Sequence, residues 1–362
     1  MSYYIGLMIG SSADNIDAAI IEVNSTDTKL VKGAGTAIPT NIKQQLFALA
    51  VDSQISIFDL NQLEYNISQL LIKAAKKIMQ LTNLSNKEIK AVGVHGFTYL
   101  HQPNNIFSSM QLVNPNLLAQ ELKIDLVTDF RRMDIANGGQ GAPLAPAFHY
   151  RLWGNMSKVA IVNIGGMANV SAWNEAELIG FDTGPGNVLL DSWVRFKLNK
   201  NYDCAGNLAS QGEVIVSLFN QLKTIEFFSK TPPKSTSRDQ FNLQFILDNI
   251  ENVDQYKACD VQATLAELTA WSIVNAIIKY CSWVDDIYIC GGGIYNLDLI
   301  RRMKNLTNKN INSIEKLDWS PDWLEAAAFA WLAKQRVDRQ ITTVATVTGA
   351  ATNSILGGLY AC

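Results

Sequence analysis

The most informative stretch of the chain is Gly180-Phe181-Asp182-Thr183-Gly184-Pro185-Gly186-Asn187. Its single aspartate follows an apolar residue and opens a turn that contains glycines and a proline. Glycine allows positive φ and a close approach of backbone N–H groups to an anion, while proline stiffens the same turn. The pattern therefore favours a carboxylate, Asp182, held beside a phosphate. An ordinary hairpin turn is the alternative, because glycine turns are common.

Glycine turns also follow other strand-like runs of the chain. The apolar run Val159–Ile164 leads into Gly165-Gly166, and the run Ile287–Cys290 leads into Gly291-Gly292-Gly293, before a helical segment that starts near Leu297. At the N-terminus, the segment Gly6–Asp17 lies between two apolar runs. Glycine turns gathered around one cleft are what the phosphates and ribose of a nucleotide require.

With these turns in place, the chain resembles the anhydro-N-acetylmuramic acid kinases from end to end. The resemblance is carried by ten blocks in the expected order: Gly10–Asp17, His95-Gly96 with Thr98, Phe130–Ala136, Gly138–Leu144, Asn163–Asn169, Gly180–Asn187, Lys230–Thr236, Asp260–Leu265, Cys290–Asn296 and Asp322–Ala326. It implies an α/β, two-lobed fold of the sugar-kinase and actin type, shared with the heat-shock ATPases, in which mixed sheets are flanked by helices and a cleft lies between the lobes.

Strand-like and helix-like runs alternate along the chain, which also favours an α/β fold. We expect strands at 4–8, 17–23, 91–94, 124–127, 159–164 and 287–290, and helices at 60–81, 187–198, 261–280 and 323–333. Apolar residues recur at helical spacing in the third helix and predict one buried face made of Val261, Leu265, Leu268, Trp271, Val274 and Ile278. Asp260 is its expected N-cap. We expect a first lobe over 1–127, a second over 128–340, and a return to the first over 341–362.

Composition excludes several classes of protein. The chain has 362 residues, 48% hydrophobic and 17% charged, and a net charge of −3, which gives no reason to expect nucleic acid or an anionic membrane as partner. The apolar stretch 268–284 is interrupted by Asn275 and Lys279, which argues against a membrane span. The five cysteines show no C-x-x-C spacing, so we interpret them as buried thiols of a reducing, cytoplasmic compartment.

The resemblance assigns the chemistry. In a 1,6-anhydro sugar, O6 is tied to C1, so the bridge must be opened by water while O6 attacks the γ-phosphate of ATP. The resemblance gives Asp182 the role of activating that water, as a glycosidase base does. The product is N-acetylmuramic acid 6-phosphate, formed in cell-wall recycling. Glu325 is a second catalytic candidate; the equal alternative is a glutamate that interacts with a helix dipole.

The remaining candidates are also carried over by resemblance. The predicted ATP-binding residues are Gly10, Ser11, Ser12, Ala13, Asp14, Asn15, Ile16, Asp17, Gly165, Gly166, Gly184, Gly186, Asn187, Gly291, Gly292, Gly293 and Asn296. Magnesium is expected, held mainly by phosphates and water, with Asp14 or Asp17 acting on those waters. No direct protein ligand for a metal is predicted. A homodimer is a family expectation.

The predicted substrate-binding residues are His95, Arg131 and Asp134. Arg131 suits the lactyl carboxylate of a muramic sugar. The alternatives are an ion pair between Arg131 and Asp134, and a structural role for His95. Lys234 and Arg238 either reach phosphate or fix their loop.

Four positions depart from the family pattern. Ile9 stands where a serine is usual, Asn15 where a glycine is usual, Phe97 where a glutamine is usual, and Gln102 where an arginine is usual. We expect Asn15 to adopt the left-handed conformation and Ile9 to remove a hydroxyl near the phosphates or the sugar. Phe97 and Gln102 together are expected to remove polar contacts from one wall of the first lobe. Besides an active anhydro-sugar kinase, a kinase with drifted sugar specificity and a non-catalytic nucleotide-binding protein therefore remain as hypotheses.

Overall fold

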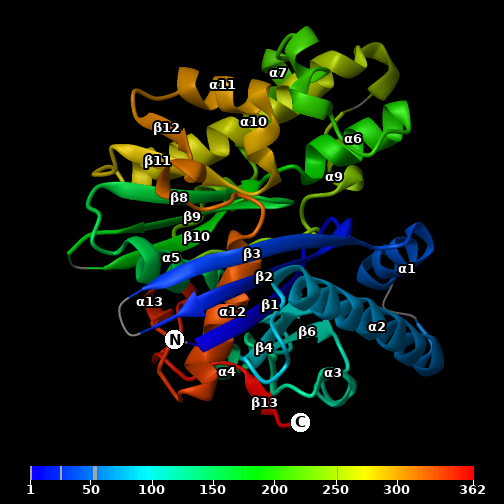
Figure 1. Cartoon of the computed structure of the whole chain (residues 1–362). Coiled ribbons are helices and arrows are strands. Elements are labelled where there is room, and N and C mark those ends of the chain that lie inside the picture. Colours follow the sequence, from blue (N-terminus) through cyan, green and yellow to red (C-terminus); the bar gives the residue numbers. More distant parts are fainter. Residues whose placement is uncertain (1, 25–26, 52–54, 176, 251) are drawn as a thin grey trace. The chain divides into compact units, whose positions relative to one another are not determined.

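The computed structural model describes residues 2–24, 27–51, 55–175, 177–250 and 252–362, which form two compact units (Figure 1). The first unit runs to Trp153 and resumes at Asp322, and the second is Gly154–Pro321. The division thus differs from the one expected after residue 127, and the return differs from the one expected at residue 341. The reason is that the segment 128–153 and the helix that follows Asp322 both pack within the first unit.

The first unit holds most of its strands in one sheet. Its elements are β1 (Ser2–Ile9), β2 (Asn15–Val23), β3 (Thr28–Ala37), α1 (Thr40–Val51), α2 (Ile57–Thr82), β4 (Ile89–His95), β5 (Phe97–Gln102), β6 (Ser108–Leu112), α3 (Pro115–Leu122), β7 (Leu126–Thr128), α4 (Arg132–Ala136), α5 (Ala145–Trp153), α12 (Leu324–Val337), α13 (Ala345–Thr348) and β13 (Gly358–Tyr360). The strand order is β13-β7-β4-β1-β2-β3, and β5 and β6 form a separate hairpin.

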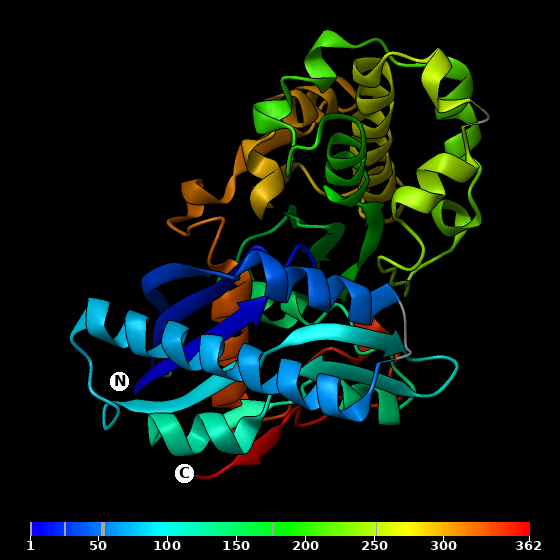
Figure 2. The same cartoon turned by 90° about the vertical axis from the view of Figure 1, so that its right-hand side faces the viewer.

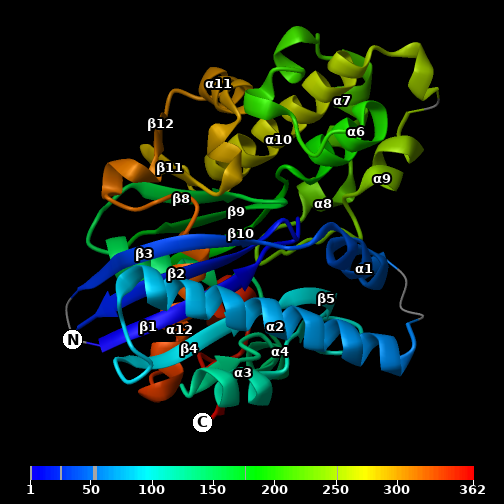
Figure 3. The same ribbon diagram turned by 45° about the vertical axis from the view of Figure 1, so that its right-hand side comes forward.

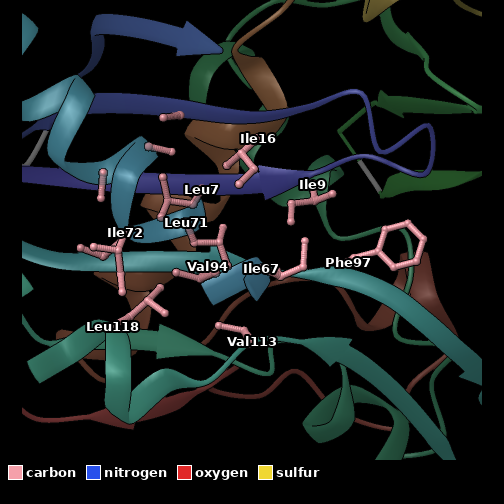
Figure 4. Packing of buried hydrophobic residues seen from close by; sticks show 14 of the residues in the cluster. Leu7, Ile9, Ile16, Ile67, Leu71, Ile72, Val94, Phe97, Val113 and Leu118 are labelled. Carbon is pink, nitrogen blue, oxygen red and sulfur yellow. The ribbon is translucent and has the colours of Figure 1, made fainter. Parts of the chain in front are cut away.

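Helices cover both faces of this sheet (Figure 2). Alternate residues of β1, among them Leu7 and Ile9, join α2 in one apolar cluster, in which Phe97 is also buried (Figure 4). On the opposite face α12 approaches β1 so closely that a Cβ on Gly6 would collide with the carbonyl oxygen of Ala326. Burial on both faces explains why β1 reads as a continuous apolar run.

The second unit has the elements β8 (Val159–Ile164), β9 (Met167–Trp173), β10 (Leu178–Pro185), α6 (Val188–Leu198), η1 (Cys204–Gly206), η2 (Ala209–Gln211), α7 (Val216–Lys223), α8 (Glu226–Ser229), α9 (Leu243–Asp248), η3 (Val253–Gln255), α10 (Ala258–Tyr280), β11 (Asp286–Cys290), η4 (Gly292–Tyr295), α11 (Leu297–Asn305), β12 (Asn310–Ser313) and η5 (Ile314–Leu317). Its sheet has the order β10-β9-β8-β11-β12.

Helix α10 is the core of the second unit (Figure 3). Its C-terminal half packs on the sheet and its N-terminal half packs on α6 to α9, so the helix is buried around most of its circumference rather than along the one predicted stripe. Ile278, expected in that stripe, is 47% exposed. The predicted cap was also wrong: Lys257 is the N-cap, and Asp260 lies in the first turn. Although α10 is long and apolar enough to cross a membrane, 78% of its most apolar window is buried.

The two sheets share one strand pattern. In the first, β1 is antiparallel to β2 and β2 to β3, while β4 and then β7 are added in parallel on the other side. In the second, β8, β9 and β10 form the antiparallel part, and β11 and β12 are added in parallel. The hairpin β1–β2 therefore corresponds to the hairpin β8–β9. The sequence shows no short-period repeat that would have indicated this correspondence.

The sequence-based secondary structure is confirmed for the six strands and four helices that were expected, within a few residues at their ends. One stretch was misjudged, because Gly180–Pro185 continues strand β10 and pairs with β9 through a bulge after Asp182. The cysteines also differ from expectation. All five are free thiols, but Cys204 and Cys362 are exposed.

Candidate active site

The glycine segments of the second unit meet at the turn between β8 and β9. The N–H of Asn187 donates to the carbonyl of Gly165 at 2.8 Å, and the N–H of Gly186 donates to Gly166 at 2.9 Å. Gly291 has a φ of +76°, and a Cβ there would collide with the side chain of Asn163 in β8. The predicted convergence of these segments is therefore confirmed within this unit.

Their N–H groups are less available than expected. Gly165 donates to Met167 at 3.1 Å and Gly291 to Pro321 at 3.0 Å, so these two N–H groups, like those of Gly186 and Asn187, already have backbone acceptors. They hold the turns together instead of facing an anion. Asn296 is likewise engaged, because its Oδ1 caps α11 by accepting from Leu299 at 3.0 Å.

Asp182 is buried near the end of β10, and a loop holds it from two directions. Its N–H donates to the carbonyl of Lys234 at 3.0 Å, and its Oδ2 accepts from the N–H of Thr236 at 2.8 Å. Hydrogen bonds from backbone N–H groups stabilise an ionised carboxylate. The carboxylate is thus oriented by the backbone of residues 234–236, which comes from a separate part of the chain.

Lys234 fixes this loop. Its buried Nζ donates to the carbonyl of Phe227 at 3.2 Å and lies 4.6 Å from the centre of the Phe227 ring. Burial lowers the pKa of Lys234 to about 8, an effect that Lys279 reinforces and the Asp182 carboxylate opposes. Of the two roles left open for Lys234, these contacts favour anchoring over phosphate binding.

In the first unit, the predicted loop 10–17 is a short turn followed by a strand. Ala13 donates to the carbonyl of Gly10 at 3.0 Å and has a φ of +49°. The left-handed residue is therefore Ala13 and not Asn15, which already belongs to β2. Ile16 is fully buried in the core, and a Cβ on Gly10 would meet no atom within 4 Å. There is therefore open space beside Gly10, whereas the side chain of Ile16 is enclosed by the core.

Several carboxylates interact electrostatically with Asp17, which follows this turn. Burial, reinforced by the charges of Glu325, Asp322 and Asp14, raises the pKa of Asp17 to about 7. Glu325 lies in the first turn of α12, and Asp14 forms an ion pair with Lys43. The structure therefore brings Glu325 and both magnesium candidates, Asp14 and Asp17, into one electrostatic neighbourhood.

His95 and Arg131 form a close pair in the first unit. Arg131 approaches Nε2 of His95 with Nε at 3.0 Å and with NH2 at 2.8 Å, and its NH1 donates to the carbonyl of Gly141 at 2.6 Å. Burial, followed by the Arg131 charge, lowers the pKa of His95 well below its usual value. The imidazole is therefore neutral and accepts through Nε2, which orients the guanidinium.

Asp134 connects three segments of the same unit. Its Oδ2 accepts from the N–H of Gly141 at 2.8 Å, and its Oδ1 accepts from the hydroxyl of Thr348 at 2.7 Å. Gly141 therefore bridges Asp134 and Arg131, donating to the first and accepting from the second. This geometry builds a rigid loop around Arg131 and makes Asp134 its support.

Two of the departures from the family pattern lie in the core. Ile9 and Phe97 are each 2% exposed within the cluster that contains α2 (Figure 4). Phe97 therefore lies in this core and not on a wall of the site, and the side chain of Ile9 also packs against apolar neighbours. Gln102, by contrast, ends β5 and accepts from Asn105 at 3.0 Å in a surface turn.

The histidines and carboxylates make no metal cage: among the residues that the structure describes, no group of three or more His, Cys, Asp or Glu side chains is arranged to hold an ion. The sequence did not predict the hydrogen bond from the backbone N–H of Thr236 to Asp182, nor the position of Asn169 opposite Asp182 in the sheet. Neither contact has a sequence pattern of its own.

Comparisons with known proteins show the family of the chain. A model of the family described as anhydro-N-acetylmuramic acid kinase matches residues 2–362. A protein of that name from Coxiella burnetii is 40% identical over 363 residues, which cover 99% of this chain and 97% of the relative. Another, from Aliivibrio fischeri, is 39% identical over 365 residues and 99% of both chains.

A solved structure supports the fold alone. Component A of the (R)-2-hydroxyglutaryl-CoA dehydratase of Acidaminococcus fermentans superimposes with a TM-score of 0.50 at 11% identity, and the match covers 91% of this chain and 96% of that one.

Proposed function

Because the chain belongs to the anhydro-N-acetylmuramic acid kinase family, we propose that it uses ATP to phosphorylate O6 of 1,6-anhydro-N-acetylmuramic acid while water opens the 1,6-bridge. The product is N-acetylmuramic acid 6-phosphate. The observation that carries the proposal is the buried, backbone-oriented carboxylate of Asp182. A carboxylate held in this way is suited to accept a proton from water as the water attacks the anomeric carbon.

The reaction assigns roles to the other candidates. Arg131, held by His95 and Gly141, presents a cation for the lactyl carboxylate of the sugar, and Asp134 supports its loop. Glu325 assists as a second carboxylate of the reaction. The predicted nucleotide-binding segments remain residues 10–17, 165–166, 184–187 and 291–293. In the second unit they act through the shape of their turns, because several of their N–H groups already have backbone acceptors.

Magnesium fits the acidic neighbourhood of the first unit. When bound with ATP, magnesium would supply positive charge that stabilises the phosphates during phosphoryl transfer. Since the described residues hold no cage of direct ligands, Asp17 and Asp14 are suited to accept hydrogen bonds from water molecules on the ion. An ion nearby would also favour the ionised form of Asp17, whose pKa is otherwise raised.

The other hypotheses lose support. Drifted specificity rested on Ile9 and Phe97, which are core residues. A nucleotide-binding protein without catalysis has no need of a clamped Asp182. We further propose a cytoplasmic protein that acts in cell-wall recycling and assembles as a homodimer.

The test is ADP release by the purified protein with Mg-ATP and 1,6-anhydro-N-acetylmuramic acid, compared with the ring-opened reducing sugar. We expect ADP release with the anhydro sugar, and a product whose mass equals the sugar plus one water and one phosphoryl group. Mg-ATP at millimolar concentration should also raise Tm. Absence of ADP release with the anhydro sugar would overturn the proposed substrate, and absence of a Tm shift would overturn the nucleotide assignment.

A further inference from the structure

A row of polar side chains crosses the sheet of the second unit beside the proposed base. Asn163 of β8 is paired with Asn169 of β9, and Asn169 is paired with Asp182 of β10. Directly paired residues point to the same face of a sheet, with Cβ atoms about 4.5–5.5 Å apart. Their chain neighbours Ile164, Ala168 and Phe181 belong to the cluster packed around α10. The three polar side chains therefore share the opposite face.

One acceptor oxygen of this row has no hydrogen-bond partner among the described residues. Oδ2 of Asp182 accepts from Thr236 at 2.8 Å, and Oδ1 of Asn163 lies 3.8 Å from the thiol of Cys290. Oδ1 of Asn169 is buried and accepts no hydrogen bond from any described residue. Native proteins leave few buried acceptors unpaired, and those that remain call for a donor from a water or a ligand.

We propose that Asn169 positions the water that opens the sugar bridge, an inference that rests on the proposed function. One hydrogen of this water passes to the Asp182 carboxylate as a proton, while the other stays on the oxygen and is accepted by Oδ1 of Asn169. The water oxygen bonds to C1 as the C1–O6 bond breaks. O6 then takes the γ-phosphoryl group from ATP, and ADP leaves.

The chemistry of the side chain suits this task. A water that attacks carbon must have a lone pair directed at C1, which two acceptors for its hydrogens enforce. Asp182 and Asn169 supply these acceptors from adjacent strands. A neutral amide orients the water without placing a second negative charge beside Asp182, which would favour protonation of the base.

The test replaces Asn169 by Leu, a similar volume without polar atoms, and by Ala, which leaves room. The control is Ser171→Ala, because Ser171 is buried two residues along the same strand and shares the face of Asn169. The initial rates of ADP release are measured with the anhydro sugar, and kcat and KM are determined for both substrates. The Tm of each variant is measured with and without Mg-ATP.

We expect both Asn169 variants to lose kcat about 10- to 100-fold, with KM for sugar and ATP within twofold of the wild type and an unchanged Mg-ATP shift. Ser171→Ala should keep its kcat within twofold. Since an unpaired acceptor is removed, Asn169→Leu should melt no lower than the wild type. A normal kcat in either folded variant would overturn the role of Asn169, as would a loss confined to the KM of the sugar. An inactive wild-type protein would instead overturn the proposed function, and this inference with it.

Discussion

The backbone N–H of Thr236 donates to Oδ2 of Asp182 across 2.8 Å, and the carbonyl of Lys234 accepts from the N–H of Asp182 at 3.0 Å. The loop and the end of β10 therefore fix one another. The loop contributes only backbone atoms to these two bonds. The clamp therefore depends on the conformation of the loop more than on the identity of residues 234 and 236. Buried Lys234, bonded to the carbonyl of Phe227, anchors that conformation.

Thr236 allows this clamp to be tested. Thr236→Pro removes the N–H, whereas Thr236→Ala keeps it and removes only the hydroxyl, which donates to Gln240 at 3.0 Å. A hydrogen bond to a charged group contributes about 1.5–3 kcal/mol, so we expect Thr236→Pro to lower kcat about 10- to 100-fold. Thr236→Ala should remain within a factor of about three, since the backbone donor persists. Equal activities of the two variants in the ADP-release assay would show that the N–H has no part in catalysis.

Ile9 and Phe97 are predicted to matter for stability and not for sugar recognition. Ile9→Ser and Phe97→Gln restore the residues usual in the family, but here they place polar groups in a packed core. Each should lower the free energy of unfolding by about 2–5 kcal/mol, measured by urea denaturation. The control Gln102→Arg, in a surface turn, should change it by less than about 0.5 kcal/mol. Variants as stable as the wild type but with altered KM for sugar would contradict the core assignment.

The raised pKa of Asp17 predicts that the stability of the folded protein depends on pH. Its pKa of about 7 in the folded protein exceeds the ordinary value of 3.8 for an aspartate, so between these pH values the folded state holds a proton that the unfolded state has released. Its contribution to stability is therefore present below about pH 4 and is lost as the pH rises through 7. Asp17→Asn lacks the titrating carboxyl and so does not lose this stability. The difference in free energy of unfolding, variant minus wild type, should therefore rise by on the order of 1–3 kcal/mol from pH 4.5 to pH 8. Urea denaturation at both pH values measures the difference, and a constant difference would contradict the raised pKa.

Much of the framework was predictable from the sequence. The buried strands β1, β4, β8 and β11 read as short apolar runs, because a strand covered on both faces needs apolar residues throughout. The long helices were equally clear. Convergence of the glycine segments at 165–166, 184–187 and 291–293 followed from their positions after strands.

What the sequence concealed depends on tertiary contacts. The stretch around Asp182 was read as a turn because glycine and proline mask a strand that ends in a bulge. The clamp by Thr236 joins a backbone N–H to a carboxylate 54 residues away, and no pattern in the sequence predicts this contact. Ile9 and Phe97 adjoin family blocks that contain candidate site residues, but their side chains pack in the core cluster that includes α2.

Conversion of Asp182 to Asn tests the central claim most directly. The variant keeps the shape of the side chain and its acceptor oxygen for Thr236, but it cannot take a proton from water. The measurement is kcat for ADP release with 1,6-anhydro-N-acetylmuramic acid, together with the Tm shift caused by Mg-ATP. We predict a loss of about 10²- to 10⁴-fold or more in kcat and a Tm shift equal to that of the wild type. Near-normal turnover by Asp182→Asn would show that Asp182 is only a structural residue at the end of β10.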